Sequence, residues 1–148
     1  INTVCLRFFT VYGERGRPDM APWLFTEKIL NGDVINQFGE GDSLRDYTYV
    51  DDIAKGIILA LEKVDQLGYE VINLGSGKTT VLKDFIKLVS DISGKTANIK
   101  ILPQQQGDVS QTQADINKAK DLLGYEPKVS LEQGMSNFIK WYKEKFNI

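Results

Sequence analysis

Short apolar runs along the chain predict β-strands. The segments concerned are rich in β-branched and aromatic residues, or they alternate apolar with polar positions, and Gly-rich turns separate several of them. The predicted strands lie within residues 4–9, 34–38, 46–50, 69–74 and 98–102. The first run, in NTVCLRFF, is almost continuously apolar, so we expect a strand covered on both faces, as in a parallel sheet.

Longer segments repeat apolar residues every three to four positions and predict helices. Gly32, Gly94 and Gly124 stand where three of these patterns stop, and Ser130 with Gln133 has the spacing of a capping box. The predicted helices lie within residues 22–31, 51–64, 81–93, 115–123 and 130–146. Because strands and helices alternate over 148 residues, the sequence predicts an α/β protein with one domain.

Composition excludes several classes of function. A net charge of −2 and a pI near 5.2 provide no general field for nucleic acid, and no apolar run approaches the roughly 20 residues that cross a membrane. The chain has no histidine, which removes His-based triads and His metal sites, and we expect no metal site. The single Cys5 fits a reducing cytoplasm.

A few polar residues stand where ligands bind in α/β proteins. Thr10 follows the first apolar strand, and ligands collect at the carboxyl ends of such strands, although a threonine also caps turns. Arg45 beside Asp46 is either a phosphate anchor oriented by its acid or a surface ion pair. Asp51 and Asp52 precede a helix, and we expect them to satisfy its first amides.

Two further segments are candidate ligand sites. INLGSG, residues 72–77, matches no nucleotide-binding template and is better explained as a strand-to-turn junction. The segment at 103–115 is polar and unpatterned, so it predicts a loop long enough to carry function. Its Asp108 and amide side chains suit sugar hydroxyls, although exposed glutamines in a loop usually have no role.

The order of these segments carries more information than any one of them. LRFFTVYG, FGEGDSLRDYTYVDDIAKGI, VINLGSG and QQQGDV follow one another as they do in the carboxyl-terminal part of the extended short-chain dehydrogenase/reductases, the NAD-dependent sugar-nucleotide epimerases and dehydratases. The chain resembles this family from about residue 4 to 142. The resemblance implies the end of a Rossmann-type doubly wound parallel sheet, followed by the smaller α/β substrate-binding domain.

Within that family, RFFTVYG with GRPDMA resembles the UDP-glucuronate 4-epimerases. Relatives that act on UDP-glucose, and the UDP-glucuronate decarboxylases, tend to have Asn where Thr10 stands. The resemblance implies that Thr10 and Arg17 grip the uronate carboxylate. A ketone at C4 lies β to that carboxylate, so a firm grip holds the bond to carbon dioxide out of alignment and prevents decarboxylation.

The resemblance also implies roles for further residues. Arg45 would bind the UDP diphosphate, Asn36 and Phe38 would line the uracil site, and Asp108 would approach the ribose or phosphates. Gln105 would also be a substrate residue, although it falls where galactose-type epimerases often have a second phosphate-binding arginine. Asp19 stands where those relatives have a neutral residue.

The NAD site would be only partly present. The resemblance implies that Phe8 and Phe9 lie beside the nicotinamide, with Tyr12 nearby. The chain has no GxGxxG fingerprint and no YxxxK pair, so we expect no catalytic residue in it, and residues 1–148 to be the mainly substrate-binding portion of a longer, homodimeric enzyme, inactive alone. The alternatives are another nucleotide-sugar epimerase or dehydratase, a UDP-glucuronate decarboxylase, and a non-catalytic nucleotide-sugar binding module.

Overall fold

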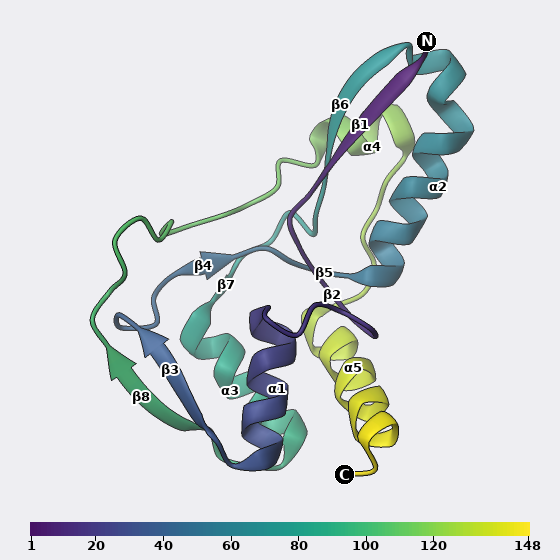
Figure 1. The fold of residues 1–148 in the computed structure, drawn as a ribbon. Helices are drawn as coiled ribbons and strands as arrows, with labels where there is room; N and C mark the ends of the chain where they lie inside the picture. The colour runs from purple at the N-terminus through teal and green to yellow at the C-terminus, as the bar shows by residue number, and fades with distance from the viewer.

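The computed structural model describes residues 1–148, and helices alternate with strands along them (Figure 1). The strands are β1 Thr3–Phe8, β2 Thr10–Tyr12, β3 Val34–Phe38, β4 Leu44–Arg45, β5 Tyr47–Tyr49, β6 Tyr69–Leu74, β7 Thr80–Val81 and β8 Asn98–Leu102. The helices are α1 Ala21–Asn31, α2 Val50–Leu67, α3 Leu82–Ser93, α4 Asn117–Leu123 and α5 Leu131–Phe146. The expected α/β class is confirmed.

The strands form four two-stranded pairs instead of one continuous sheet. β1 pairs with β6, β2 with β5 and β3 with β8, all in parallel, while β4 pairs antiparallel with β7. In Figure 1 the long β1–β6 pair lies beside α2 and α4 at one end of the molecule, and α1, α3, α5 and the β3–β8 pair lie at the other. The chain begins at the first end and finishes at the second.

Two hydrophobic clusters correspond to these two ends. One joins α1, α3 and α5 to β3 and β5, and the other joins α2 and α4 to β6. Strand β2 contributes to both, since Val11 packs against the α2–α4 cluster while Tyr12 is buried in the other. Successive side chains of a strand point to opposite faces, so the short β2–β5 pair connects the two cores.

Most helix boundaries follow the sequence prediction closely. Gly32, Gly94 and Gly124 all end helices in the left-handed conformation, with φ between 71° and 79°. Ser130 accepts a hydrogen bond from the backbone N–H of Gln133, which is one half of the expected capping box. The Gln133 side chain donates to Asn137 instead of turning back, so the second half is not formed.

The expectation that the first strand is covered on both faces was wrong for this chain. Val4 and Leu6 pack against the α2–α4 cluster, but the alternate side chains Thr3, Cys5 and Arg7 are exposed. The physical reason is that β1 pairs with β6 alone, and both α2 and α4 pack on the face that carries Ile72 and Leu74. The other face and the second edge of β1 have no partner within the chain.

The predicted run at 46–50 also differs in the structure. Its first residue, Asp46, lies between β4 and β5, and Val50 is already the first residue of α2. The polypeptide changes partner at Asp46, from antiparallel β7 to parallel β2, so no single strand continues across it. No helix of the chain is both long enough and apolar enough to cross a membrane.

Candidate functional site

The candidate site is built around Arg45, the last residue of β4. Its Nη2 donates a hydrogen bond to Oδ1 of Asp108 at 2.8 Å, and its Nη1 donates to the backbone carbonyl of Leu44 at 2.9 Å. The Arg45 side chain is 22% exposed and that of Asp108 is 38% exposed. The guanidinium is thus held at two points, half-buried, with further N–H groups available to a ligand.

Asp46 is not the partner of Arg45, so the pairing of these two residues that both sequence-based alternatives assumed was wrong. Its carboxylate is fully buried and accepts hydrogen bonds from Ser76, Gly77, Ala114 and Thr48. Neighbouring side chains of an extended chain point to opposite sides, so Arg45 faces outward while Asp46 faces inward. The Ser76 and Gly77 contacts also identify INLGSG as a structural turn, as expected.

The loop at 103–115 brings Asp108 to Arg45. Leu44 donates its backbone N–H to Ser110 at 2.8 Å and accepts from Thr112 at 3.0 Å, so the loop runs beside β4 like a short parallel strand. Gln105 lies in the same loop, is exposed, and forms no side-chain hydrogen bond. The structure therefore unites Arg45 with Asp108 and leaves Gln105 in solvent.

A small groove of about 230 Å³ lies beside this ion pair. Residues 38–43 form one wall, and Gln104, Asp108 and Ser110 form the other. Phe38 therefore shares a groove with Asp108, and their expected contacts with uracil and ribose stay predictions. Asn36 lies two residues earlier on β3, on the same exposed side of the strand as Phe38.

Thr10 lies in a strand pair next to Asp46, whereas Arg17 lies on the surface. Thr10 opens β2, pairs with Tyr47, and donates its backbone N–H to the carbonyl oxygen of Asp46 at 3.1 Å. Arg17 lies in the exposed turn before α1 and forms a two-pronged ion pair with Asp19, at 2.5 and 3.1 Å. The hydrogen bond to Asp19 raises the pKa of Arg17, and Arg17 makes no hydrogen bond to another candidate residue.

The three residues expected near the nicotinamide have unequal access. Phe8 ends β1 with 48% of its surface exposed, whereas Phe9 packs against the α2–α4 cluster. Tyr12 is 3% exposed and donates its hydroxyl to the carbonyl of Leu131 at 3.3 Å. Burial, followed by the nearby Tyr49 and Asp52, raises the pKa of Tyr12. Phe8 is the member of this set that presents an open surface at the carboxyl end of a parallel strand.

Asp52 also has a role that differs from the expected one. Its buried carboxylate does not satisfy the first amides of α2; it accepts from the backbone N–H groups of Lys128 and Val129 at 3.0 and 2.9 Å. These partners lie 76 and 77 residues away, so local sequence gives no sign of them. Asp52 fixes the segment before α5 and lies outside the candidate site.

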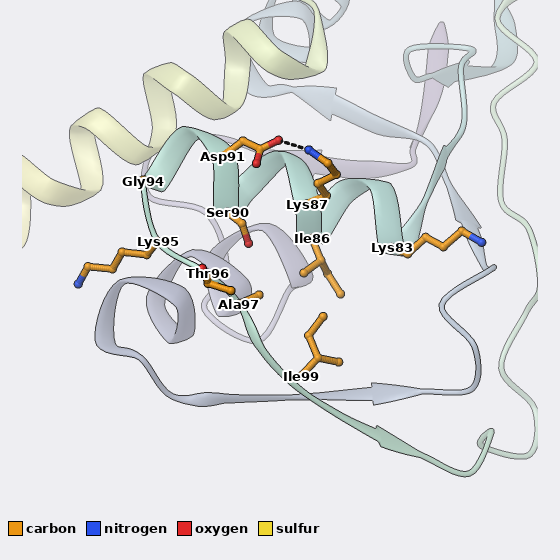
Figure 2. A pocket seen from close by; sticks show the side chains of 10 residues that line it. All are labelled: Lys83, Ile86, Lys87, Ser90, Asp91, Gly94, Lys95, Thr96, Ala97 and Ile99. Atoms are coloured by element: carbon orange, nitrogen blue, oxygen red, sulfur yellow. Dashed lines mark hydrogen bonds and ion pairs between the residues drawn. The ribbon is translucent and has the colours of Figure 1, made fainter.

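The largest groove in the chain is elsewhere and carries no comparable chemistry. It has a volume of about 540 Å³ and lies between α3 and β8 (Figure 2). Lys87 is paired with Asp91, Lys83 with Asp42, and Lys95 with the carbonyl of Leu30. Figure 2 shows Lys83 and Lys95 extending away from the groove at its opposite ends, so no group of cations converges in it.

Comparison with known proteins places this geometry in a family. A sequence model of the NAD dependent epimerase/dehydratase family matches residues 1–75. The UDP-glucuronate 4-epimerase of Thermodesulfobacterium geofontis is 43% identical over 144 residues, which cover 97% of this chain and 44% of that protein.

Solved structures agree with the sequence relatives. The UDP-glucuronic acid 4-epimerase of Bacillus cereus, in complex with UDP-glucuronic acid and NAD, superimposes with a TM-score of 0.91 at 41% identity, over 98% of this chain and 46% of that one. The UDP-glucose 4-epimerase of Thermotoga maritima, with UDP-glucose, gives a TM-score of 0.88 at 36% identity, over 97% and 46%.

The chain thus spans about half the length of the relatives it matches. The match runs through β1, the Arg45 segment and the loop at 103–115, since it covers nearly all of this chain. The family match and the shared fold lead to one conclusion: the chain belongs to the NAD dependent epimerase/dehydratase family.

Proposed function

We propose that the chain is the substrate-binding, carboxyl-terminal part of a longer NAD-dependent UDP-glucuronate 4-epimerase, which converts UDP-glucuronate to UDP-galacturonate. The observation that carries the proposal is the Arg45–Asp108 pair beside the groove that Phe38 lines. Similarity to UDP-glucuronate 4-epimerases at 38–43% identity supports the choice of substrate.

Arg45 is proposed to bind the diphosphate. A guanidinium held at Leu44 and Asp108 loses little rotational freedom when a ligand arrives, and its fork matches phosphate oxygens. Asp108 neutralises Arg45 while the site is free, and the diphosphate replaces this carboxylate or shares the guanidinium with it. Asn36 and Phe38 are proposed to hold the uracil, with Phe38 offering an apolar face and Asn36 an amide.

Thr10 and Arg17 are proposed to bind the uronate carboxylate. Thr10 supplies a hydroxyl from the start of β2, and Arg17 supplies a guanidinium that is paired with Asp19 in the free chain. Arg17 exchanges Asp19 for the substrate carboxylate, at small cost because the pair is exposed to water. Gln105, exposed on the loop, is the remaining proposed substrate residue, as a weak polar contact.

The residues present fit one edge of an NAD site. Phe8 provides an exposed apolar surface at the carboxyl end of β1, where dinucleotides lie in sheets of this kind, and no Gly-rich phosphate loop occurs in the chain. NAD, when bound, would supply a reversible hydride acceptor for C4 of the sugar. The chain's own contribution is to hold the nucleotide and the carboxylate while the sugar rotates and presents the opposite face of C4.

The proposal is tested with the full-length gene product, NAD and UDP-glucuronate. Formation of UDP-galacturonate without carbon dioxide supports the epimerase, and release of carbon dioxide assigns the enzyme to the decarboxylases. UDP binding without turnover leaves a nucleotide-sugar binding module. We also propose that the full-length enzyme is a cytoplasmic homodimer. Light scattering of the full-length protein checks the dimer.

A further inference from the structure

We infer that Asp46, the residue next to Arg45, is a positioning residue. It holds both proposed substrate-binding segments, the Thr10 strand and the Asp108 loop, beside Arg45. The inference rests on the proposed function for its link to UDP. The attachment itself rests on hydrogen bonds within the chain.

The loop at 103–115 runs beside β4 in parallel register. Leu44 is bridged to Gln111, donates its N–H to Ser110, and accepts at its carbonyl from Thr112. If this parallel ladder continued regularly, the N–H of Asp46 would bond to the carbonyl of Thr112, and the N–H of Ala114 would then bond to the carbonyl of Asp46. In this chain that carbonyl accepts the N–H of Thr10 at 3.1 Å instead.

The Asp46 side chain takes the place of the backbone carbonyl as the acceptor for Ala114. Its Oδ2 accepts the N–H of Ala114 at 3.1 Å and the N–H of Gly77 at 3.0 Å. Its Oδ1 accepts the N–H and the hydroxyl of Ser76 at 2.9 and 2.7 Å, and the hydroxyl of Thr48 at 3.1 Å. One residue therefore binds the Thr10 strand with its backbone and the end of the Asp108 loop with its carboxylate.

The packing beside this carboxylate leaves no room for a methyl group at Gly75. A methyl group added at Gly75 would lie 2.4 Å from Cβ of Ala114 and 3.1 Å from Oδ2 of Asp46. Leu44, the other anchor of the loop, shares its carbonyl between Thr112 and Nη1 of Arg45. Movement of the loop end is thus transmitted to the guanidinium as well as to Asp108.

The experiment compares two buried aspartates in the full-length protein. Asp46→Ala removes the acceptor for Gly77 and Ala114, while Asp52→Ala removes an equivalent acceptor for Lys128 and Val129, outside the candidate site. We measure the dissociation constant of UDP by calorimetry, KM and kcat for UDP-glucuronate, and amide hydrogen exchange of residues 103–116.

Asp46→Ala is expected to weaken UDP binding and raise KM by about tenfold or more with kcat little changed, and to speed exchange at Thr112 and Ala114. Asp52→Ala is expected to lower the melting temperature similarly and to leave UDP affinity within about twofold. Asp46→Asn keeps one carbonyl acceptor and should restore part of the affinity. Equal UDP affinity in wild type and Asp46→Ala, or equal losses in the two alanine variants, overturns the inference.

A second pair of variants covers the case in which Asp46→Ala does not fold. Gly75→Ala pushes Ala114 away from Asp46, and Gly56→Ala places a comparable methyl 2.7 Å from Leu74 in the same cluster. The inference requires that Gly75→Ala alone weakens UDP binding. If the wild type binds no UDP, the proposed function fails, and exchange at Thr112 and Ala114 in the same variants decides the attachment separately.

Discussion

Arg45 and Asp108 are 63 residues apart in the sequence, and Nη2 of Arg45 lies 2.8 Å from Oδ1 of Asp108. Neither residue is fully exposed, and the two come from a strand and a loop that the backbone of Leu44 joins. In the free site, the Asp108 carboxylate therefore lies on the Arg45 guanidinium, which is proposed to receive the diphosphate. A ligand that binds Arg45 must compete with Asp108 or share the guanidinium with it.

Replacement of Arg45 by glutamine is expected to weaken UDP binding about 100-fold, because a charge-assisted contact to phosphate contributes roughly 1.5–3 kcal/mol. Calorimetric titration of the full-length enzyme with UDP measures the loss. Arg7→Gln is the matched control, since Arg7 bonds to Asn73 on the exposed face of the β1–β6 pair. Equal affinity in the wild type and Arg45→Gln would exclude Arg45 as the diphosphate ligand.

Replacement of Arg17 by glutamine is expected to raise KM for UDP-glucuronate by about tenfold and to leave KM for UDP-glucose nearly unchanged. The proposed carboxylate contact exists only with the uronate. Steady-state kinetics with both nucleotides, together with assay of released carbon dioxide, measure the difference. Arg15→Gln changes a neighbouring charge in the same loop and should affect neither substrate; a parallel loss for both substrates would remove Arg17 from the carboxylate site.

The local elements were predictable from the sequence, and the long-range contacts were not. Leu82, Phe85, Ile86 and Val89 follow the helical period, so α3 and its glycine stop were found from spacing alone. Asp46 and Asp52 accept hydrogen bonds from residues 30 to 77 positions away, and no local pattern distinguishes a buried acid of this kind from a helix cap. The exposure of β1 depends on which strands adjoin it, which is also a property of the whole fold.

Several residues of the candidate site were predictable from the sequence, and the way they are oriented was not. Arg45 and Asp108 were candidates from their local sequence, and Phe38 came from the resemblance; the structure pairs Arg45 with Asp108 and places Asp108 and Phe38 in one groove. The orientation of Asp46 was missed, although the alternation of Arg45 outward and Asp46 inward follows from strand geometry once the strand is known. Arg17 and Gln105 are exposed and stay predictions, because no contact within the chain fixes them at the groove.

Alkaline pH is expected to destabilise the protein partly through Tyr47. Burial raises the pKa of Tyr47 to about 12, an effect that the positive charge of Arg45 opposes. The unfolded chain releases this proton near pH 10, so the stabilisation is complete below about pH 10 and is lost as the pH rises towards 12. Tyr47→Phe should flatten the decline of the melting temperature above pH 10 in the full-length enzyme.

The Tyr47 hydroxyl makes no hydrogen bond within the chain, so the phenylalanine variant should retain its stability at neutral pH. Tyr69→Phe is the control, because Tyr69 is the first residue of β6 and its side chain is exposed. Identical pH curves for the wild type and Tyr47→Phe would show that the hydroxyl does not titrate differently on folding.

The isolated 148-residue chain is expected to associate or to unfold readily. Ile57, Ile58 and Leu61 form an exposed apolar stripe on α2, where Leu61 is 72% exposed, and the second edge of β1 is unpaired. Size-exclusion chromatography with light scattering, followed by thermal melting, tests this. Ile58→Lys with Leu61→Lys should reduce association, while Val109→Lys, at a solitary exposed apolar residue, should not. A monomer with a cooperative melt would contradict the prediction.

The pairing of strands has a consequence for the order of events in folding. β1 cannot form its pair with β6 until β6 has been synthesised, since Thr3 is in register with Tyr69, and the β3–β8 pair likewise waits for β8, with Val34 opposite Asn98. No pair of adjacent strands forms a hairpin that could nucleate the fold locally. Chains whose contacts join distant segments fold slowly. On the ribosome, more than sixty further residues must therefore be synthesised before the β6 partner of β1 exists, and the rate at which β6 emerges sets how long the β6-facing edge of β1 stays open to chaperones.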